Sequence, residues 1–359
     1  MLPRPLPLAE PPRSVCLLRL SAIGDTCHAV PILRTLQRAW PRTQFTWIIG
    51  KTEARLMSLI EGVELIIVDK RAGLGARREL RQQLRGRQFD VLLHLQLAFR
   101  ASLVSREVRA SVKVGFDRAR ARELQWLFTN ARIAARTREH VLDSFYGFTE
   151  ALGIKDRVVT WDVPLPAEAR EYAERIIPDA QPTLVISPCS SHSARNWLAD
   201  RYAAVADYAA GQHGMRVVLC GGPTQQEREM GAAIEAAVHA PVINQIGRDT
   251  LPQLLALLAR ASVLVAPDSG PAHMASMVRT PVVGLYAATN PARSGPYLSR
   301  AWCVNAYDEA AQRFRGRSSE RLPWTEKIEE PGVMELITVK QVTSKLDQAL
   351  KYSAGANAT

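Results

Sequence analysis

The sequence predicts an α/β protein of two domains, each built on a parallel β-sheet covered by helices. The chain has 359 residues, of which 47% are apolar and 23% charged, so it is too long for one ordinary core and too apolar for disorder. Short apolar stretches alternate with helical patterns along most of its length, which is typical of parallel sheets. The pattern that opens the chain returns near residue 183, which indicates a second domain.

The first domain is expected over residues 1–165. It opens with an apolar strand at Ser14–Leu20, which ends in the loop SAIGD and is followed by a helical stretch at His28–Trp40. The later elements alternate in the same way. Strands are expected at Phe45–Ile49, Leu65–Val68, Val91–Leu95 and Ser111–Gly115, with helices at Ala54–Ile60 and Glu79–Gly86.

Residues 166–182 are expected to link the domains, because prolines punctuate this stretch around one helical segment, Ala167–Ile177. The second domain then covers residues 183–359, with an irregular polar segment at 306–333, a last helix at Val342–Lys351 and a loose tail. Its strands are expected at Thr183–Ser187, Arg216–Cys220, Val242–Asn244, Ser262–Ala266 and Val282–Tyr286, and its helices at Leu198–Gln212, Gln225–His239, Leu251–Ala259 and Ala272–Val278.

Composition indicates a cytoplasmic protein. No apolar run approaches the roughly 20 residues of a membrane helix, and the proline-rich start lacks the apolar segment of a signal peptide. The five cysteines lie far apart, with no C-x-x-C pair and no histidine at zinc-ligand spacing. They are expected to be reduced and mostly buried.

The positive charge is concentrated in one segment. Residues 71–138 contain 16 lysines and arginines against 5 aspartates and glutamates, an excess that equals the net charge of +11 of the whole chain. Such a concentration suggests an anionic partner, which could be nucleic acid, anionic lipid or a phosphorylated glycolipid. An arginine-rich solvated face is the alternative.

The loop SAIGD, residues 21–25, places Asp25 between a strand and a helix, with Gly24 allowing a sharp turn. A helix N-terminus keeps a carboxylate ionised, which suits a general base. Asp is also a favoured helix N-cap, so a purely structural role is equally compatible with the pattern.

A second motif, VLVAPDSGPAH at 263–273, brings Asp268, Ser269 and Gly270 to the start of a helix, with His273 in its first turn. Free backbone N–H groups and the helix dipole favour an anion there. Gly270 permits close approach of a phosphate, and the Ser269 hydroxyl can donate a hydrogen bond. An ordinary helix cap with a satisfied histidine is the alternative.

The third motif is CSSHSARNW at 189–197, which follows the first strand of the second domain. Its hydroxyls, Ser190 and Ser191, and the Arg195 guanidinium suit a diphosphate, whereas Trp197 is expected to pack in the core. The chain has no G-x-x-x-x-G-K-[ST], no G-x-G-x-x-G after its first strand and no D-x-D. We therefore expect no metal or cofactor, and phosphates neutralised by protein groups.

Together the three loops resemble the family 9 glycosyltransferases, the ADP-heptose:lipopolysaccharide heptosyltransferases and their relatives, over roughly residues 14–350. The stretches that carry the resemblance are LRLSAIGDTCHAVPILRTL at 18–36 and APDSGPAHMASMVRTPVVGLYAATNP at 266–291. The resemblance implies two Rossmann-like domains facing across a cleft, the GT-B arrangement, with the acceptor on the first domain and the donor on the second. It also implies a metal-independent enzyme.

Within this resemblance, Asp25 matches the catalytic base, and Arg195 takes the position of a lysine in many members. The donor phosphates fall to Ser190, Ser191, Ser269 and Gly270, with Asp268 and His273 completing that motif. Gln225 stands where some members have an acidic ribose contact and Glu227 lies two positions on, so no ribose ligand is assigned.

The expected reaction is an inverting transfer of heptose from ADP-heptose to an anionic lipid A and Kdo core acceptor, with peripheral contact at the inner face of the inner membrane. Arg100 and Arg120, in the basic segment, are expected to contact that acceptor. One alternative is a related glycosyltransferase with another nucleotide sugar or acceptor, and a second is a sugar-nucleotide 2-epimerase, which shares the fold. A nucleic-acid-binding protein is disfavoured, because the basic segment has few aromatics and no RNA-binding motif.

Overall fold

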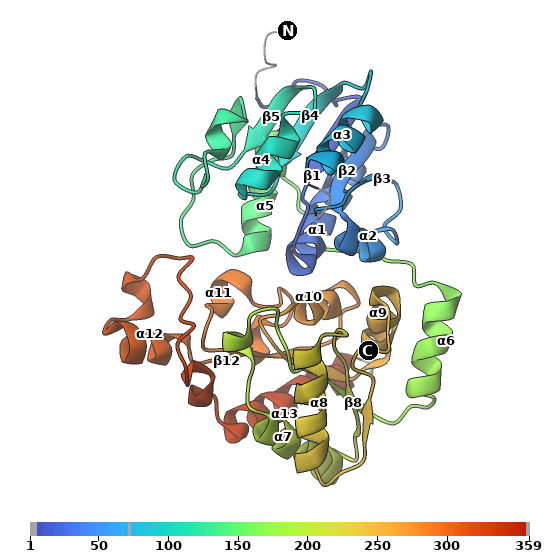
Figure 1. The fold of residues 1–359 in the computed structure, drawn as a ribbon, viewed down its shortest axis with the longest axis vertical. Coiled ribbons are helices and arrows are strands. Elements are labelled where there is room, and N and C mark those ends of the chain that lie inside the picture. Colours follow the sequence, from blue (N-terminus) through green and yellow to red (C-terminus); the bar gives the residue numbers. More distant parts are fainter. Residues whose placement is uncertain (1–5, 71–72, 357–359) are drawn as a thin grey trace. The chain divides into compact units, whose positions relative to one another are not determined.

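The computed structural model describes residues 6–70 and 73–356. Contacts divide the chain into two compact units, Met1–Pro164 and Leu165–Thr359. Each unit contains one six-stranded sheet flanked by helices (Figure 1), and every strand pairing within the sheets is parallel. The α/β class and the two Rossmann-like folds that the sequence predicts are therefore confirmed.

The sheet of the first unit has the order β3-β2-β1-β4-β5-β6, the doubly wound order that grows outward from β1 in both directions. The apolar run at the start of the chain forms the buried central strand β1, because both its faces are covered. The elements are β1 (Ser14–Leu18), α1 (Ile23–Ala39), β2 (Gln44–Gly50), α2 (Lys51–Met57), β3 (Glu64–Val68), α3 (Gly73–Gln83), β4 (Phe89–His94), α4 (Phe99–Ser105), β5 (Ala110–Gly115), the 3-10 helix η1 (Gln125–Leu127), β6 (Ala131–Arg132) and α5 (Val141–Ala151).

The second unit repeats this topology. Its strand order is β12-β11-β10-β7-β8-β9, which in the reverse direction corresponds strand by strand to that of the first sheet, with β7 in the place of β1. Its elements are α6 (Ala167–Ile176), β7 (Thr183–Ile186), η2 (Ser193–Arg195), α7 (Ala199–His213), β8 (Arg216–Leu219), α8 (Gln225–Ala237), β9 (Val242–Asn244), α9 (Leu251–Arg260), β10 (Val263–Pro267), α10 (Gly270–Met277), β11 (Val282–Tyr286), α11 (Pro291–Ser294), η3 (Arg300–Trp302), β12 (Val304–Asn305), α12 (Tyr307–Arg315), η4 (Ser319–Arg321), η5 (Val333–Leu336) and α13 (Val339–Ala356).

Residues 166–182, expected as a linker, contain α6, which packs against α9 of the second unit. The Tyr172 hydroxyl donates a hydrogen bond of 3.0 Å to Oε1 of Gln245. The contact boundary accordingly falls before this helix, between Pro164 and Leu165.

Several elements differ from the sequence expectation. The segment 306–333 is not irregular throughout, because α12 buries Tyr307, Ala310 and Ala311 along one side. The helix α1 begins at Ile23, so Asp25 lies inside it. The last helix extends to Ala356, into the stretch expected as a loose tail, and residues 357–359 of that tail lie outside the described residues.

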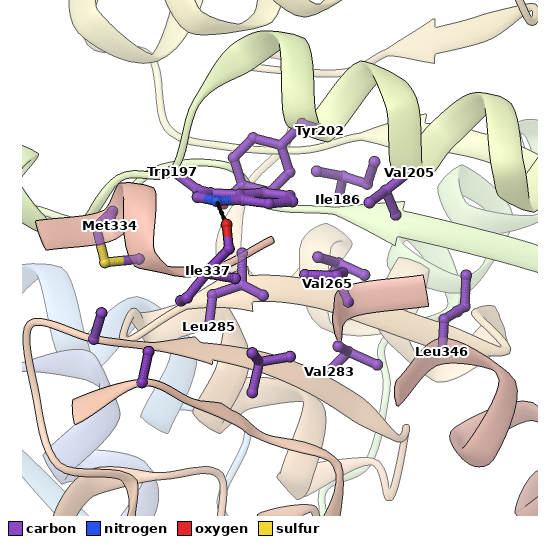
Figure 2. Close-up of a cluster of buried hydrophobic side chains, with 14 of the residues drawn as sticks. Ile186, Trp197, Tyr202, Val205, Val265, Val283, Leu285, Met334, Ile337 and Leu346 are labelled. Carbon is purple, nitrogen blue, oxygen red and sulfur yellow. Dashed lines mark hydrogen bonds between the residues drawn. The ribbon is translucent and has the colours of Figure 1, made fainter. Parts of the chain in front are cut away.

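The core of the second unit forms around Trp197, as expected from the sequence (Figure 2). Its side chain is 1% exposed, its ring meets Tyr202 edge-to-face at 5.1 Å between centroids, and its Nε1 donates to the Ile337 carbonyl at 3.1 Å. All five cysteines are free and buried, in agreement with the expectation of reduced thiols.

Candidate functional site

Asp25 lies in the first turn of α1, beyond the carboxyl end of the central strand β1. In doubly wound sheets this edge binds ligands. The N-cap position of α1 is Ala22, and no side chain makes a cap hydrogen bond. Asp25 is therefore not the N-cap, and its carboxylate instead forms an ion pair with Nη2 of Arg19 while remaining 34% exposed.

Arg19 is a further candidate site residue, which the sequence analysis missed. Its side chain is only 11% exposed, its Nη1 donates to the Leu95 carbonyl, and its guanidinium lies 5.5 Å from the centre of the Phe145 ring. The guanidinium is thus fixed between β4 and α5, and it fixes the Asp25 carboxylate in turn. The sequence points to Arg19 only by placing a basic residue within the otherwise apolar stretch LLRL at 17–20.

The loop before Asp25 is held from neighbouring elements. The Leu20 N–H donates to Oε1 of Gln96 at 2.7 Å, and Nζ of Lys70 donates to the Leu20 carbonyl at 3.3 Å. Lys70 also pairs with the buried Glu53, 2.9 Å from its Oε1. Because its backbone groups are bonded on both sides, the loop presents Asp25 in a defined position.

In the second unit, Ser269 is the N-cap residue of α10, but its side chain makes no cap hydrogen bond. Its Oγ is buried and has no hydrogen-bond partner among the described residues. A buried hydroxyl without a partner costs free energy, and the adjacent helix N-terminus favours an anion. The simple capping role left open by the sequence therefore does not describe Ser269.

Arg195, from η2, lies between two carboxylates. Its Nη1 is 3.6 Å from Oδ2 of Asp268, and its Nη2 is 3.1 Å from Oε1 of Glu329. Asp268 also accepts a 3.2 Å hydrogen bond from Ser294 Oγ and lies 3.8 Å from Nε2 of His273. Folding thus joins Arg195 to the D-S-G-x-x-H motif through Asp268, and it adds Glu329 and Ser294, which the sequence analysis missed.

The electrostatics of this cluster favour an ionised Asp268. Burial raises the pKa of its carboxyl, but the interactions with His273 and Arg195 outweigh burial and hold the pKa below its ordinary value. Asp268 is therefore an acceptor that orients Arg195 and His273. The contacts of Asp268 indicate that it positions the side chains around it, those of Arg195, His273 and Ser294.

Ser190 and Ser191 lie in the loop of residues 189–197, which also carries Arg195 and is called the Arg195 loop. Their environments differ. Ser190 is 8% exposed; its N–H donates to Oδ1 of Asn196 at 2.7 Å, and its Oγ accepts from the His192 N–H at 3.4 Å. Ser191 is exposed. No described hydrogen bond joins either serine to Asp268 or Ser269.

The Gly-Gly-Pro turn after β8 is closed by Glu227, whose Oε1 accepts from the Gly222 N–H at 2.8 Å. Glu227 Oε2 also accepts from Oγ1 of Thr224, the N-cap residue of α8, at 2.6 Å. Gln225 instead donates to Glu229 at 2.7 Å. Glu227 therefore closes the turn at the carboxyl edge of the sheet.

The two arginines expected at the acceptor differ as well. Arg100 is exposed in the first turn of α4. Arg120 pairs with Asp117 and with Glu139, 2.8 Å from its Oε2, and donates to the Ala134 carbonyl at 2.8 Å. Arg120 thus ties together the loop on either side of β6. Residues 71–72 of the basic segment lie outside the described residues.

The described residues contain neither a cluster of metal-ligating side chains nor a membrane-spanning helix. Within residues 6–70 and 73–356, no group of three or more His, Cys, Asp and Glu side chains is arranged to hold a metal ion. Over the same residues, no helix combines the length and the apolar character that spanning a bilayer requires.

Comparison with known proteins gives consistent matches. The model of glycosyltransferase family 9 (heptosyltransferase) matches residues 77–324. The lipopolysaccharide core heptosyltransferase OpsX of Haemophilus influenzae is 41% identical over 337 residues, which are 94% of this chain and 97% of that protein.

Solved structures show the same fold at lower identity. A family 9 glycosyl transferase from Veillonella parvula is 22% identical, with a TM-score of 0.77 over 95% of this chain and 97% of its own. The E. coli heptosyltransferase WaaC with ADP is 21% identical, with a TM-score of 0.71 over 94% of this chain and 99% of its own.

Proposed function

This chain belongs to glycosyltransferase family 9, the heptosyltransferases, and from that premise we propose that it transfers heptose from ADP-heptose to a Kdo-containing inner-core acceptor. The chain is a glycosyltransferase of lipopolysaccharide core assembly, as its 41% identical relative is named. Family membership favours this function over the 2-epimerase and nucleic-acid alternatives. The relative WaaC was solved with ADP and with ADP-2-deoxy-2-fluoro heptose, which supports an ADP-linked donor here.

The observation that carries the donor assignment is the buried, unpartnered Ser269 hydroxyl at the start of α10. The β-phosphate of ADP-heptose would accept from this hydroxyl and from backbone N–H groups at Gly270. Arg195 would neutralise the diphosphate, oriented by Asp268 and His273. Ser190 and Ser191 complete the proposed donor site through the Arg195 loop.

The proposed reaction is a single displacement with inversion. The acceptor hydroxyl oxygen forms a bond to the anomeric carbon while the bond from that carbon to the phosphate oxygen breaks, and ADP leaves with the electron pair. Asp25 takes the hydroxyl proton, and its ion pair with Arg19 holds the carboxylate in a fixed orientation. Arg195 stabilises the charge that grows on ADP.

No divalent cation is required in this proposal, because protein groups supply the positive charge at the phosphates. The acceptor is proposed to be anionic, with Arg100 as a direct contact and Arg120 as a second residue of that surface. We further propose that the enzyme works at the cytoplasmic face of the inner membrane, where a lipid A acceptor is anchored.

The test is release of ADP from ADP-heptose in the presence of Kdo-bearing lipid A, measured with and without EDTA. Nuclear magnetic resonance of the product assigns the anomeric configuration. The proposal requires a heptosylated product, inversion, and equal rates with the chelator. A retained configuration, or a rate that EDTA abolishes and magnesium restores, would contradict the mechanism.

A further inference from the structure

Four large hydrophobic side chains are exposed close together on the first unit. Phe99, Leu124, Trp126 and Leu127 are 43%, 50%, 41% and 59% exposed, and we call them the apolar patch. Two contacts join Phe99, at the start of α4, to the turn that carries the other three side chains. The Phe99 N–H donates to the Glu123 carboxylate, and the Phe99 ring meets Phe128 edge-to-face at 6.1 Å between centroids. Among the described residues only three other large hydrophobics are exposed, so this grouping is specific to one surface.

The patch is presented by an anchored turn. Gln125, at the start of η1, is fully buried; its Oε1 accepts from the Phe116 N–H at 3.0 Å. Its Nε2 donates to the carbonyls of His94 at 2.9 Å and Gln96 at 3.1 Å. Because Gln125 fixes the turn to the ends of β4 and β5, its neighbours Leu124, Trp126 and Leu127 lie on the outside of a rigid support.

The backbone of this turn is held in an unfavourable conformation. Glu123 and Leu124 have φ angles of 49° and 61°, the left-handed region that costs a non-glycine residue about 1 kcal/mol or more. Glycine or asparagine at position 124 would relieve the cost. A leucine that leaves half of its side chain in solvent gains little from burial to offset this cost, and a binding role accounts for it.

The surroundings of the patch are positively charged. The Arg118 guanidinium lies 4.7 Å from the centre of the Trp126 ring, and the exposed Arg100 follows Phe99 directly. Exposed arginines also stand along the chain on either side of η1, Arg122 before it and Arg132 after it. Apolar side chains accompanied by exposed arginines match a bilayer surface that contains anionic lipid, because the apolar groups enter the acyl boundary while guanidinium groups meet phosphates.

We propose that the apolar patch inserts into the interfacial layer of a membrane containing anionic lipid and docks the enzyme there. This inference rests on the proposed function for its purpose, since α4 and η1 lie at the same edge of the sheet as Asp25. Docking at this edge would hold the base near the sugars of a lipid-anchored acceptor. Membrane binding itself requires neither donor nor acceptor, so it is measured independently of transfer.

The experiment is flotation of the full chain with vesicles that lack any glycolipid acceptor. Vesicles of phosphatidylcholine with about one third phosphatidylglycerol, which gives the surface a negative potential, are compared with vesicles of phosphatidylcholine alone. The wild type should bind the anionic vesicles at least about tenfold more tightly. Combining Leu124→Ser, Trp126→Ser and Leu127→Ser should weaken binding by about tenfold or more, and Arg118→Gln alone by about fivefold.

The matched control is Leu298→Ser, which removes an exposed leucine of the second unit and should leave vesicle binding unchanged. Trp126→Ser alone serves as a milder variant, and a melting temperature near that of the wild type verifies folding. Transfer to a water-soluble Kdo oligosaccharide should persist in the triple variant. Equal binding of wild type and triple variant, or equal binding to neutral and anionic vesicles, would overturn the proposal.

A wild type that forms dimers which the triple variant breaks would also overturn it, since a second copy of the chain would then cover the patch. Light scattering after gel filtration measures this. Loss of transfer to all acceptors with normal vesicle binding would instead count against the proposed function and leave the docking surface intact.

Discussion

Glu329 accepts two hydrogen bonds from Arg195, from Nε at 3.2 Å and from Nη2 at 3.1 Å. The guanidinium proposed to bind the donor phosphates is therefore already paired with a carboxylate of its own unit. A diphosphate that approaches Arg195 must compete with Glu329 for the same N–H groups. The Glu329 side chain is 34% exposed, so the pair is partly screened by solvent and can exchange.

We predict that Glu329→Gln increases ADP affinity by about two- to fivefold, because a partly exposed competing charge contributes up to about 1 kcal/mol. Isothermal titration calorimetry measures the ADP dissociation constant. Glu335→Gln, which removes an exposed charge nearby in sequence, is the matched control and should leave that constant unchanged. Weaker ADP binding by Glu329→Gln would show that Glu329 supports the site instead of competing for it.

Ser269→Ala should weaken ADP binding by roughly 10- to 150-fold, because one hydrogen bond to a charged group contributes about 1.5–3 kcal/mol. The melting temperature should not fall, since the hydroxyl makes no hydrogen bond among the described residues. Thr250→Ala is the reciprocal control, because Thr250 caps α9 through a complete capping box. That variant should lose about 1 kcal/mol of stability and keep its ADP affinity. Similar effects of both variants would place Ser269 among structural caps.

Much of the fold could be predicted from the sequence because both sheets are buried on two faces. A strand such as β11 then appears as a continuous apolar run, and Val282–Tyr286 matches the expected bounds. The helix α12 could not be predicted in this way, because its buried face consists of Tyr307, Ala310 and Ala311 within a strongly polar segment. Short alanines give little periodic signal, and their burial depends on the core of the unit that they contact.

The candidate site was predictable only where a motif is continuous. Asp25, Ser269 and Arg195 each follow closely after the carboxyl end of an apolar strand, which is where α/β sheets bind ligands. Their partners come from elsewhere: Glu329 lies 134 residues after Arg195 along the chain. Such pairs depend on how the loops approach one another after folding, and no local spacing encodes them.

Asp25→Asn should reduce turnover by roughly 10²–10⁴, the usual effect of losing a general base. The ADP dissociation constant should change little, since Asp25 and the proposed phosphate site belong to different units. Asp156→Asn, an exposed carboxylate of the same unit, is the matched control for turnover. If Asp25→Asn turned over at the wild-type rate, Asp25 would have no part in the chemistry.

The stability of the second unit should depend on the titration of Asp249. Burial, with Glu227 adding a smaller effect, raises the pKa of Asp249 from 3.8 to about 7. Between these values the unfolded chain releases the proton while the folded chain keeps it, so this group lowers stability as pH rises from about 4 to 7. Asp249→Asn, which cannot ionise, should therefore melt roughly 3–8 °C above the wild type at pH 8.

The corresponding gain for Asp249→Asn at pH 5 should be smaller, because the wild-type carboxyl is then mostly protonated in the folded state. Differential scanning calorimetry at the two pH values measures both gains. Asp156→Asn should show neither. An equal gain at both pH values would mean that the amide acts by packing or hydrogen bonding and that the charge of Asp249 is not the cause.

Arg100 lies in the first turn of α4, at the edge of the sheet that also carries Asp25, and it makes the strongest test of an anionic acceptor. Phosphates and carboxylates of a lipid A and Kdo core can each accept two parallel hydrogen bonds from a guanidinium. We predict that Arg100→Gln raises the acceptor Michaelis constant by about three- to tenfold and lowers its salt dependence, with ADP affinity unchanged. Arg106→Gln, at the other end of the same helix and also exposed, removes the same charge without facing that edge, so its Michaelis constant should stay close to the wild-type value. The measurement uses a soluble Kdo oligosaccharide at low and high salt, which separates acceptor recognition from membrane docking. Equal effects of the two variants would mean that Arg100 acts only through the net charge of the protein. A salt-independent wild-type Michaelis constant would mean that the basic segment has no role in acceptor binding.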